Sequence, residues 1–84
     1  MPESAVELLQ PEVGEVVGRM SRAALRRVLK RHYGSIVQLS RDMQPPRSHV
    51  LIVNWLRGRG TSAHVEVAVR RRVNELLEEE KRNV

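Results

Sequence analysis

The sequence predicts a small all-α protein, a bundle of four to five helices. Apolar residues recur every three or four positions in several separate segments, the spacing that places them on one face of a helix. A serine able to cap a helix start precedes each of the four clearest segments, at Ser21, Ser35, Ser48 and Ser62. Residues that end helices follow the first three segments, namely Gly34, Pro45-Pro46 and Gly58. Residues 65–69 alternate like a strand, but a long helical pattern surrounds them and favours a helix.

The composition limits what the chain can be. A domain of 84 residues buries roughly 60% of its unfolded surface, so dimerisation would help to stabilise it. The absence of cysteine excludes disulfides and thiolate zinc sites. No apolar run approaches the roughly 20 residues of a membrane span, and the N-terminus is acidic, unlike the basic start of a signal peptide. We therefore expect a cytoplasmic protein with no membrane segment.

We divide the chain into an acidic N-terminal segment, residues 1–20, and a helical domain, residues 21–84, that ends in a long helix. In the first segment Ser4 and Glu7 have the spacing of a capping box, which predicts a short helix before Pro11. A helical stripe follows, weakened by two glycines, and consists of Val13, Val16, Val17 and Met20. The segment is a packed helix, a dimer contact or a loosely ordered arm.

Two helices are expected next. The first runs from Ser21 to Tyr33, with basic residues, Arg22 among them, on its polar face, and Gly34 supplies the left-handed residue that ends it. Its apolar face consists of Leu25, Val28, Leu29, His32 and Tyr33. Ser35 and Gln38 form a second capping box, which opens a helix to about residue 43. Its inward residues are Ile36, Leu39 and Met43.

The two remaining helices follow a proline turn. Pro45 and Pro46 end the preceding helix because proline has no amide donor, and Ser48 caps a helix that Gly58 and Gly60 end. The buried face of that helix is expected to be Ile52, Trp55 and Leu56. Thr61 or Ser62 opens the last helix, to about Arg82, with Val65, Val69, Val73, Leu76 and Leu77 inward. Opposite charges four apart indicate a partly solvent-facing helix: Glu66/Arg70, Arg71/Glu75 and Glu78/Arg82.

The charge is arranged in three zones. The net charge is −4 over residues 1–18, +11 over residues 19–72 and −2 over residues 73–84. A basic centre between acidic ends is typical of a surface that binds a polyanion. Arginine greatly outnumbers lysine there, which suits phosphate and guanine because the guanidinium donates two parallel hydrogen bonds. The alternative is a solvated helical protein with an arginine-rich composition.

One set of residues carries a family resemblance. Leu39-Ser40 is a leucine and small-residue pair, Ser48 opens the next helix, Ile52 and Trp55 are three apart, and Arg57-Gly58-Arg59 follows. With this pattern the chain, over about residues 21–80, resembles the phage-repressor and Cro type of helix-turn-helix domain. The resemblance implies a helix-turn-helix bundle that regulates transcription by binding double-stranded DNA. A homodimer would place recognition helix 48–57 in the major groove at two half-sites one helical turn apart.

The chain departs from the family pattern in three places. Ser40 stands where alanine is common, and Gln44-Pro45-Pro46 lengthens the turn and replaces the usual glycine. Val50 and Leu51 are apolar where the family commonly offers hydrogen-bonding side chains. A valine or leucine either contacts a thymine methyl group or is buried against the lengthened turn.

The candidate DNA-binding residues lie mainly on the recognition helix. At its start, Arg47 contacts guanine or phosphate, Ser48 binds phosphate or only caps the helix, and His49 donates to a base edge. Farther along, Asn54 pairs with adenine and Val53 contacts a thymine methyl group. The phosphate contacts are assigned to Arg57 and Arg59, with Ser35 and Gln38 on the backbone of the same strand. For each residue the alternative is a cap or a solvated surface position.

Other classes of function fit less well. His32, His49 and His64 are too scattered in the sequence for a metal site, and no catalytic motif is present, so we expect no enzyme, cofactor or small-molecule substrate. The rival hypothesis is a helical protein–protein interaction module, an antitoxin-like or phage-inhibitor adaptor without base readout. Single-stranded RNA binding is disfavoured because aromatic stacking residues are scarce. A dimer would form through the last helix or the N-terminal segment.

Overall fold

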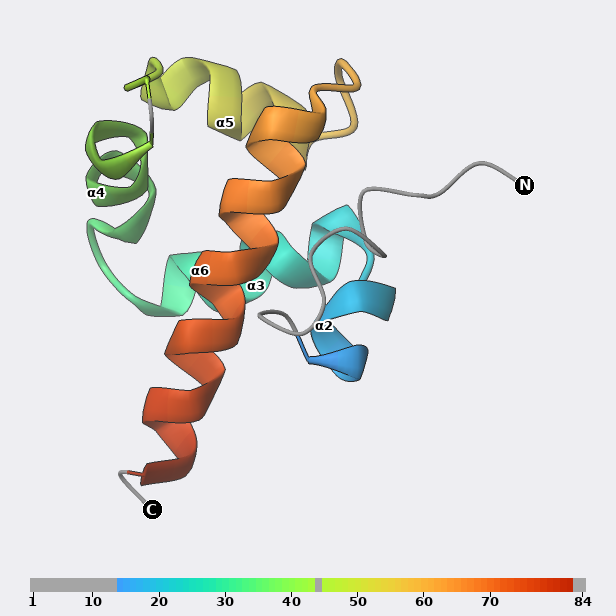
Figure 1. Ribbon diagram of the computed structural model, residues 1–84, viewed down its shortest axis with the longest axis vertical. Helices are drawn as coiled ribbons and strands as arrows, with labels where there is room; N and C mark the ends of the chain where they lie inside the picture. The colour runs from blue at the N-terminus through green and yellow to red at the C-terminus, as the bar shows by residue number, and fades with distance from the viewer. Residues whose placement is uncertain (1–13, 44, 83–84) are drawn as a thin grey trace.

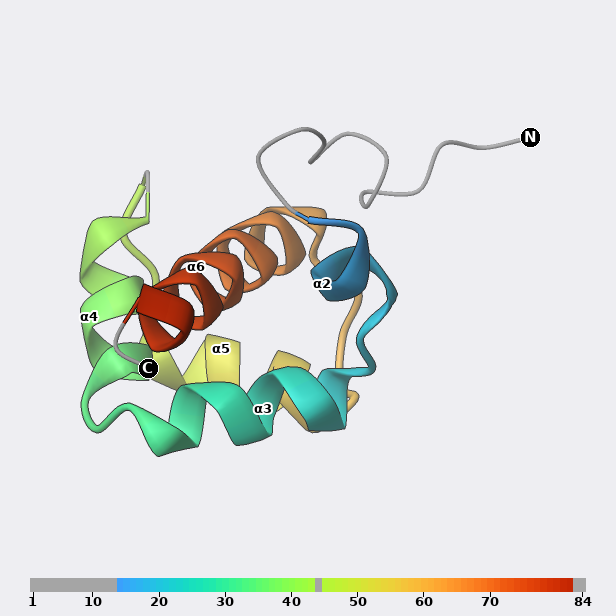
Figure 2. The same cartoon turned by 90° about the horizontal axis from the view of Figure 1, so that it is seen from below.

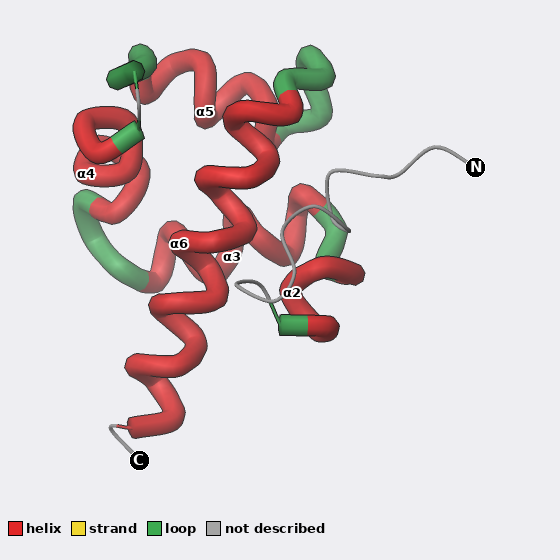
Figure 3. The backbone as a smooth tube through the Cα atoms, viewed as in Figure 1, coloured by secondary structure: helices red, strands yellow, loops and turns green. Residues whose placement is uncertain are grey.

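The computed structural model describes residues 14–43 and 45–82 (Figure 1). In these ranges the chain forms helices α2 (Glu15–Arg19), α3 (Arg22–Arg31), α4 (Ser35–Asp42), α5 (His49–Leu56) and α6 (Ala63–Arg82). The predicted all-α class is confirmed, and Figure 3 shows only helices and loops in the described ranges. Residues 65–69 lie within α6. The capping box at Ser4 and Glu7 lies outside the described residues.

Helix α6 is the element to which every other described helix is attached. Its 20 residues span about 30 Å, and α2, α3, α4 and α5 all contact it. In Figure 2, α4 and α2 lie on opposite sides of α6, and α3 runs along a third side. Helix α5 lies across the N-terminal end of α6, whereas the C-terminal half of α6 extends away from it (Figure 1).

The core is built from the apolar faces that the sequence predicted. The stripe of α6 is buried from Val65 to Leu76, and Trp55 is buried as expected. The buried apolar residues are Val17, Leu25, Val28, Leu29, Leu39, Met43, Ile52, Trp55, Leu56, Val65, Val69, Val73 and Leu76. Ile36 and Leu77 are only partly buried against this cluster. The helical spacing of the apolar residues was therefore sufficient to locate most of the core.

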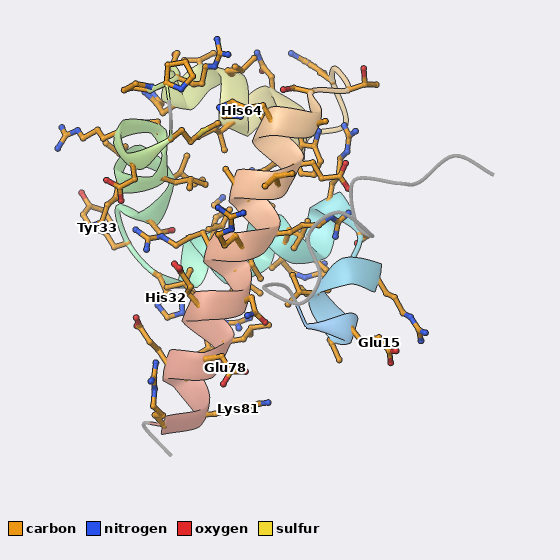
Figure 4. The ribbon with its side chains drawn as sticks, in the orientation of Figure 1. Glu15, His32, Tyr33, His64, Glu78 and Lys81 are labelled. Atoms are coloured by element: carbon orange, nitrogen blue, oxygen red, sulfur yellow. The ribbon has the colours of Figure 1, made fainter. Side chains whose placement is uncertain are left out.

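Two residues expected on apolar faces are exposed instead. Helix α3 ends at Arg31, because His32 adopts an extended backbone with φ −114° and ψ 95°. The chain leaves the helix before Tyr33, whose side chain is fully exposed at the α3–α4 turn (Figure 4). Val16 is 72% exposed, because the short helix α2 turns Val17 toward α6 and carries Val16 about 100° away. Both expectations were wrong.

Three of the four predicted serine caps are present. Ser21, Ser48 and Ser62 each accept a hydrogen bond from a backbone N–H two or three residues later, at 3.1–3.2 Å. The predicted capping box at Ser35 was wrong, because Ser35 is the first residue of α4 and Gly34, with φ 79°, occupies the N-cap. The Ser35 hydroxyl instead donates to the Leu29 carbonyl at 2.7 Å and ties α3 to α4.

The C-terminal end of α3 is joined to α6 by an ionic contact. Glu80 accepts hydrogen bonds from Arg31 Nη2 at 3.1 Å and lies 2.7 Å from Nε2 of His32. Figure 4 shows His32 beside the lower half of α6. The hydrogen bond with His32, and then that with Arg31, lower the pKa of Glu80 below its usual value of 4.5. Because Glu80 is at the surface, this ion pair contributes little to the stability of the fold.

Arg70 is the buried cation that holds α2 in place. Its side chain forms the predicted pair with Glu66, at 2.9 Å between Nε and Oε2. Its Nη1 also donates to the carbonyls of Val17 at 2.8 Å and Met20 at 3.0 Å, and the residue is only 8% exposed. These carbonyls lie at the C-terminal end of α2, where the Met20 N–H also donates to the Val17 carbonyl at 3.2 Å, so the charged donor adds to the hydrogen bonds that end the helix. The charge pair was predicted as a feature of a solvated face, and the burial of its arginine was missed.

We expect Arg70→Ala to lower the free energy of unfolding by about 2 to 3 kcal/mol. The substitution removes three hydrogen bonds from a charged donor and leaves Glu66 without its partner. Denaturant unfolding followed by circular dichroism measures the change. Arg82→Ala, at the exposed end of α6, is the control and should cost less than about 0.5 kcal/mol. Equal unfolding midpoints for the two variants would contradict the structural role of Arg70.

Candidate nucleic-acid interface

Helix α5 has one buried face and one outer face at the end of the bundle. Ile52, Trp55 and Leu56 are buried against the core. Contacts with α3, α4 and α6 hold this inner face, and α5 lies at one end of the bundle (Figure 3). The outer face is available for a partner because none of the described helices covers it.

The N-terminal end of α5 is rigidly placed and exposes polar groups. The Arg47 N–H donates to the Ser40 carbonyl at 3.0 Å, which fastens the turn to α4. The Ser48 hydroxyl accepts from the N–H of Val50 at 3.1 Å, so Ser48 has the predicted capping role. The side chains of Arg47, Ser48 and His49 are all exposed. The structure therefore brings these three predicted residues together at one corner of the molecule.

The outer face of α5 is more apolar than a solvated helix requires. Val50 is 53% exposed and Leu51 is 41% exposed. Val53 and Asn54, farther along the helix, are half-buried. The predicted base-contacting pair Val53 and Asn54 is thus less accessible than the first turn of the helix.

The C-terminal end of α5 is a loop that presents two arginines. Arg57 is the C-cap of α5. Gly58 and Gly60 adopt φ values of 90° and 82°, a backbone conformation that residues other than glycine rarely adopt. The Arg59 N–H donates back to the Asn54 carbonyl at 2.9 Å. Arg57 and Arg59 are both exposed. The glycines therefore fold the loop sharply and leave both guanidinium groups in solvent.

Arg22 fixes this loop to α3. Its guanidinium lies 4.2 Å from the centroid of the Trp55 ring. Its Nη1 donates to the Trp55 carbonyl at 3.1 Å and to the Gly60 carbonyl at 3.0 Å. The sequence placed Arg22 on the polar face of its helix, and no local pattern connects it with Trp55, 33 positions away. Arg22 is thus a positioning residue for the arginine-bearing loop that sequence reasoning missed.

The charge around α5 is unbalanced. Residues 43–65 contain Arg47, Arg57 and Arg59 but no Asp or Glu. In the described ranges, none of these three arginines forms an ion pair with a carboxylate. Both ends of α5 therefore carry arginines that pair with no carboxylate among the residues that the structure describes.

The two predicted residues of α4 are placed differently from each other. Ser35 is 5% exposed and its hydroxyl is used by the Leu29 carbonyl, which is unfavourable for the predicted contact with a DNA backbone. Gln38, one turn later, is exposed. Of the nine candidate residues, Ser35 is the one that the fold buries.

The histidines do not form a site. In Figure 4, His64 lies near the N-terminal end of α6 and His32 lies beside its C-terminal half. Among the described residues, no group of three potential ligands is arranged to hold a metal ion. Within the same ranges, no helix combines the length and the apolar character needed to cross a membrane.

Comparisons with protein-family models, curated proteins and solved structures found no match to this chain. We therefore infer the function from the geometry and charge of α5 and its flanking loops.

We expect Arg22→Ala to loosen the loop that follows α5. The loss of the ring contact and of two hydrogen bonds should lower the free energy of unfolding by about 1 to 2 kcal/mol. Trp55 is the only tryptophan, so its fluorescence should shift to the red as water reaches the ring. Arg27→Ala, at an exposed position of the same helix, is the control. An unchanged emission spectrum in Arg22→Ala would refute this role.

Proposed function

We propose that this chain is a sequence-specific, double-stranded DNA-binding regulator that places α5 in the major groove. The observation that carries the proposal is the exposed outer face of α5, with exposed arginines at both ends that pair with no carboxylate of the described residues. An α-helix with its side chains is about 10 to 12 Å in diameter, which fits the major groove, about 12 Å wide. The resemblance to the phage-repressor and Cro type of helix-turn-helix domain supports the same assignment.

The residues divide the work of binding by their position. Arg57, Arg59 and Arg47 contact phosphates on either side of the groove, which provides affinity without sequence information. His49 and Asn54 reach base edges, Asn54 by pairing with adenine. Ser48 lies at the start of α5, where backbone N–H groups at the N-terminus of a helix favour the binding of a phosphate. Gln38 contacts the backbone from α4.

A single helix of this size reads few base pairs, so the proposal includes a homodimer that binds two half-sites. A groove of about 520 Å³ lies between α2 and the C-terminal half of α6, with Val16, Val17 and Leu77 among its lining residues. Its lining residues on α6 fall within 74–81, in the half of the helix that extends away from α5 (Figure 1). A second copy seated there leaves α5 free, and both elements that the sequence offered as dimer contacts contribute to it.

The same groove favours a second candidate, a helical protein–protein interaction module without base readout. The two candidates differ in what Asn54 and Arg47 do. Substitution of these residues abolishes selective DNA binding under the first candidate and leaves the binding of a protein partner at the groove unchanged under the second.

The test of the proposed function is DNA binding measured over a range of salt concentrations. A duplex pool of mixed sequence is exposed to the protein and the retained molecules are sequenced. A palindrome with half-sites about 10 base pairs apart is expected. On that duplex, Arg57→Gln and Arg59→Gln should each reduce the slope of log affinity against log salt by about 1 per contacted phosphate.

Arg82→Gln, at the far end of α6, is the matched control and should leave the slope unchanged. Binding without enrichment of any sequence would reduce the protein to a non-specific DNA binder. The absence of binding even at low salt would exclude the DNA assignment.

We expect Val16→Glu to convert a dimer into a monomer in sedimentation experiments, because it places a charge in the apolar groove. Val37→Glu is the matched control, since Val37 is 41% exposed on α4 outside the groove. The control should sediment as the unsubstituted chain does. If the Val16→Glu protein remains dimeric, the dimer contact lies on a surface other than this groove.

A further inference from the structure

We propose that the first turn of α5 reads 5-methyl groups of thymine through Val50 and Leu51, an inference that rests on the DNA-binding function proposed above. The chemical group recognised is the methyl at C5 of a pyrimidine. Thymine carries it, and so does 5-methylcytosine. The half-site would therefore contain thymine at the positions that these two side chains face.

The first observation is the exposure of both side chains. A burial of Val50 and Leu51 against the lengthened turn was one of two explanations for their apolar character. The structure leaves them 53% and 41% exposed, so about half of each side chain is not covered by the described residues. Their neighbours on the inner face, such as Ile52, are fully buried, so the core is complete without them. This exposure favours the other explanation, contact with a thymine methyl group.

The second observation is the charge that surrounds this apolar pair. Arg47 precedes the pair by three residues, and Arg57 and Arg59 lie at the other end of the helix. With no carboxylate in residues 43–65, the partner that complements this surface is a polyanion. The partner must therefore offer apolar groups between two rows of negative charge. The major groove of DNA has that character, because the thymine methyl is the one apolar group on its base edges.

The third observation is the register of Val50 and Asn54. The two residues are four apart in α5 and so lie on the same side of the helix, one turn from each other. Asparagine pairs with the N6 and N7 atoms of adenine, whereas valine contacts the methyl group of thymine. Both preferences select A·T pairs. The geometry thus predicts a half-site with two nearby A·T pairs, with at least one thymine methyl directed at Val50.

The test replaces thymine by deoxyuridine, one position at a time, in the selected duplex. This change removes the methyl group and keeps the hydrogen-bonding pattern of the pair. We expect about fourfold weaker binding for each contacted methyl group, the effect of one buried carbon. Val50→Ala should remove most of the difference between the thymine and deoxyuridine duplexes at one position. Val37→Ala, the matched control on α4, should retain the full difference.

The outcomes separate the inference from the function on which it rests. Selective binding with equal affinity for all deoxyuridine duplexes would overturn the methyl readout and leave the DNA-binding function intact. No binding of any duplex would refute the proposed DNA-binding function. A further duplex carries 5-methylcytosine in place of the contacted thymine, and a partial recovery relative to cytosine supports methyl recognition. Tighter binding of that duplex than of the thymine duplex would overturn thymine as the group that is read.

Discussion

The apolar stripe of α6 is the surface on which the other described helices depend. Val65, Val69 and Val73 have no exposed surface, and α2, α3, α4 and α5 all contact this helix. A chain of 84 residues can bury only a limited core. Here one apolar stripe serves as the packing surface for all four of the other described helices. The position of α5 follows from it, because α5 is held across the end of α6 by side chains that pack on this stripe.

The arginines of this protein have two different physical roles. Arg70 and Arg22 are turned inward, where their guanidinium groups donate to backbone carbonyls at the ends of α2 and α5. Arg47, Arg57 and Arg59 remain exposed around α5. The net charge of +5 is thus shared between inward arginines and exposed ones, among them the three around α5, where residues 43–65 contain no Asp or Glu. In the proposed complex these exposed arginines attract the DNA phosphates.

The two ends of α6 suit two separate tasks. The N-terminal end supports α5 and its arginines, and the C-terminal half forms an apolar groove with α2. In the proposed assembly the first end contacts DNA and the second end contacts another copy of the chain. Because the two surfaces lie at opposite ends of one rigid helix, the separation of the two recognition helices in a dimer would be set by α6.

The sequence by itself determined the helices, most of the core and the starts of α3, α5 and α6, because helical spacing and caps are properties of neighbouring residues. It also indicated Arg47, Ser48 and His49 as one exposed corner. The tertiary structure decided the rest. The backbone of His32 ended α3 before Tyr33, Leu29 took the Ser35 hydroxyl, and the inward turns of Arg22 and Arg70 came from partners 33 to 53 positions away. Contacts at such separations leave no periodic signal, because they depend on how the helices are packed.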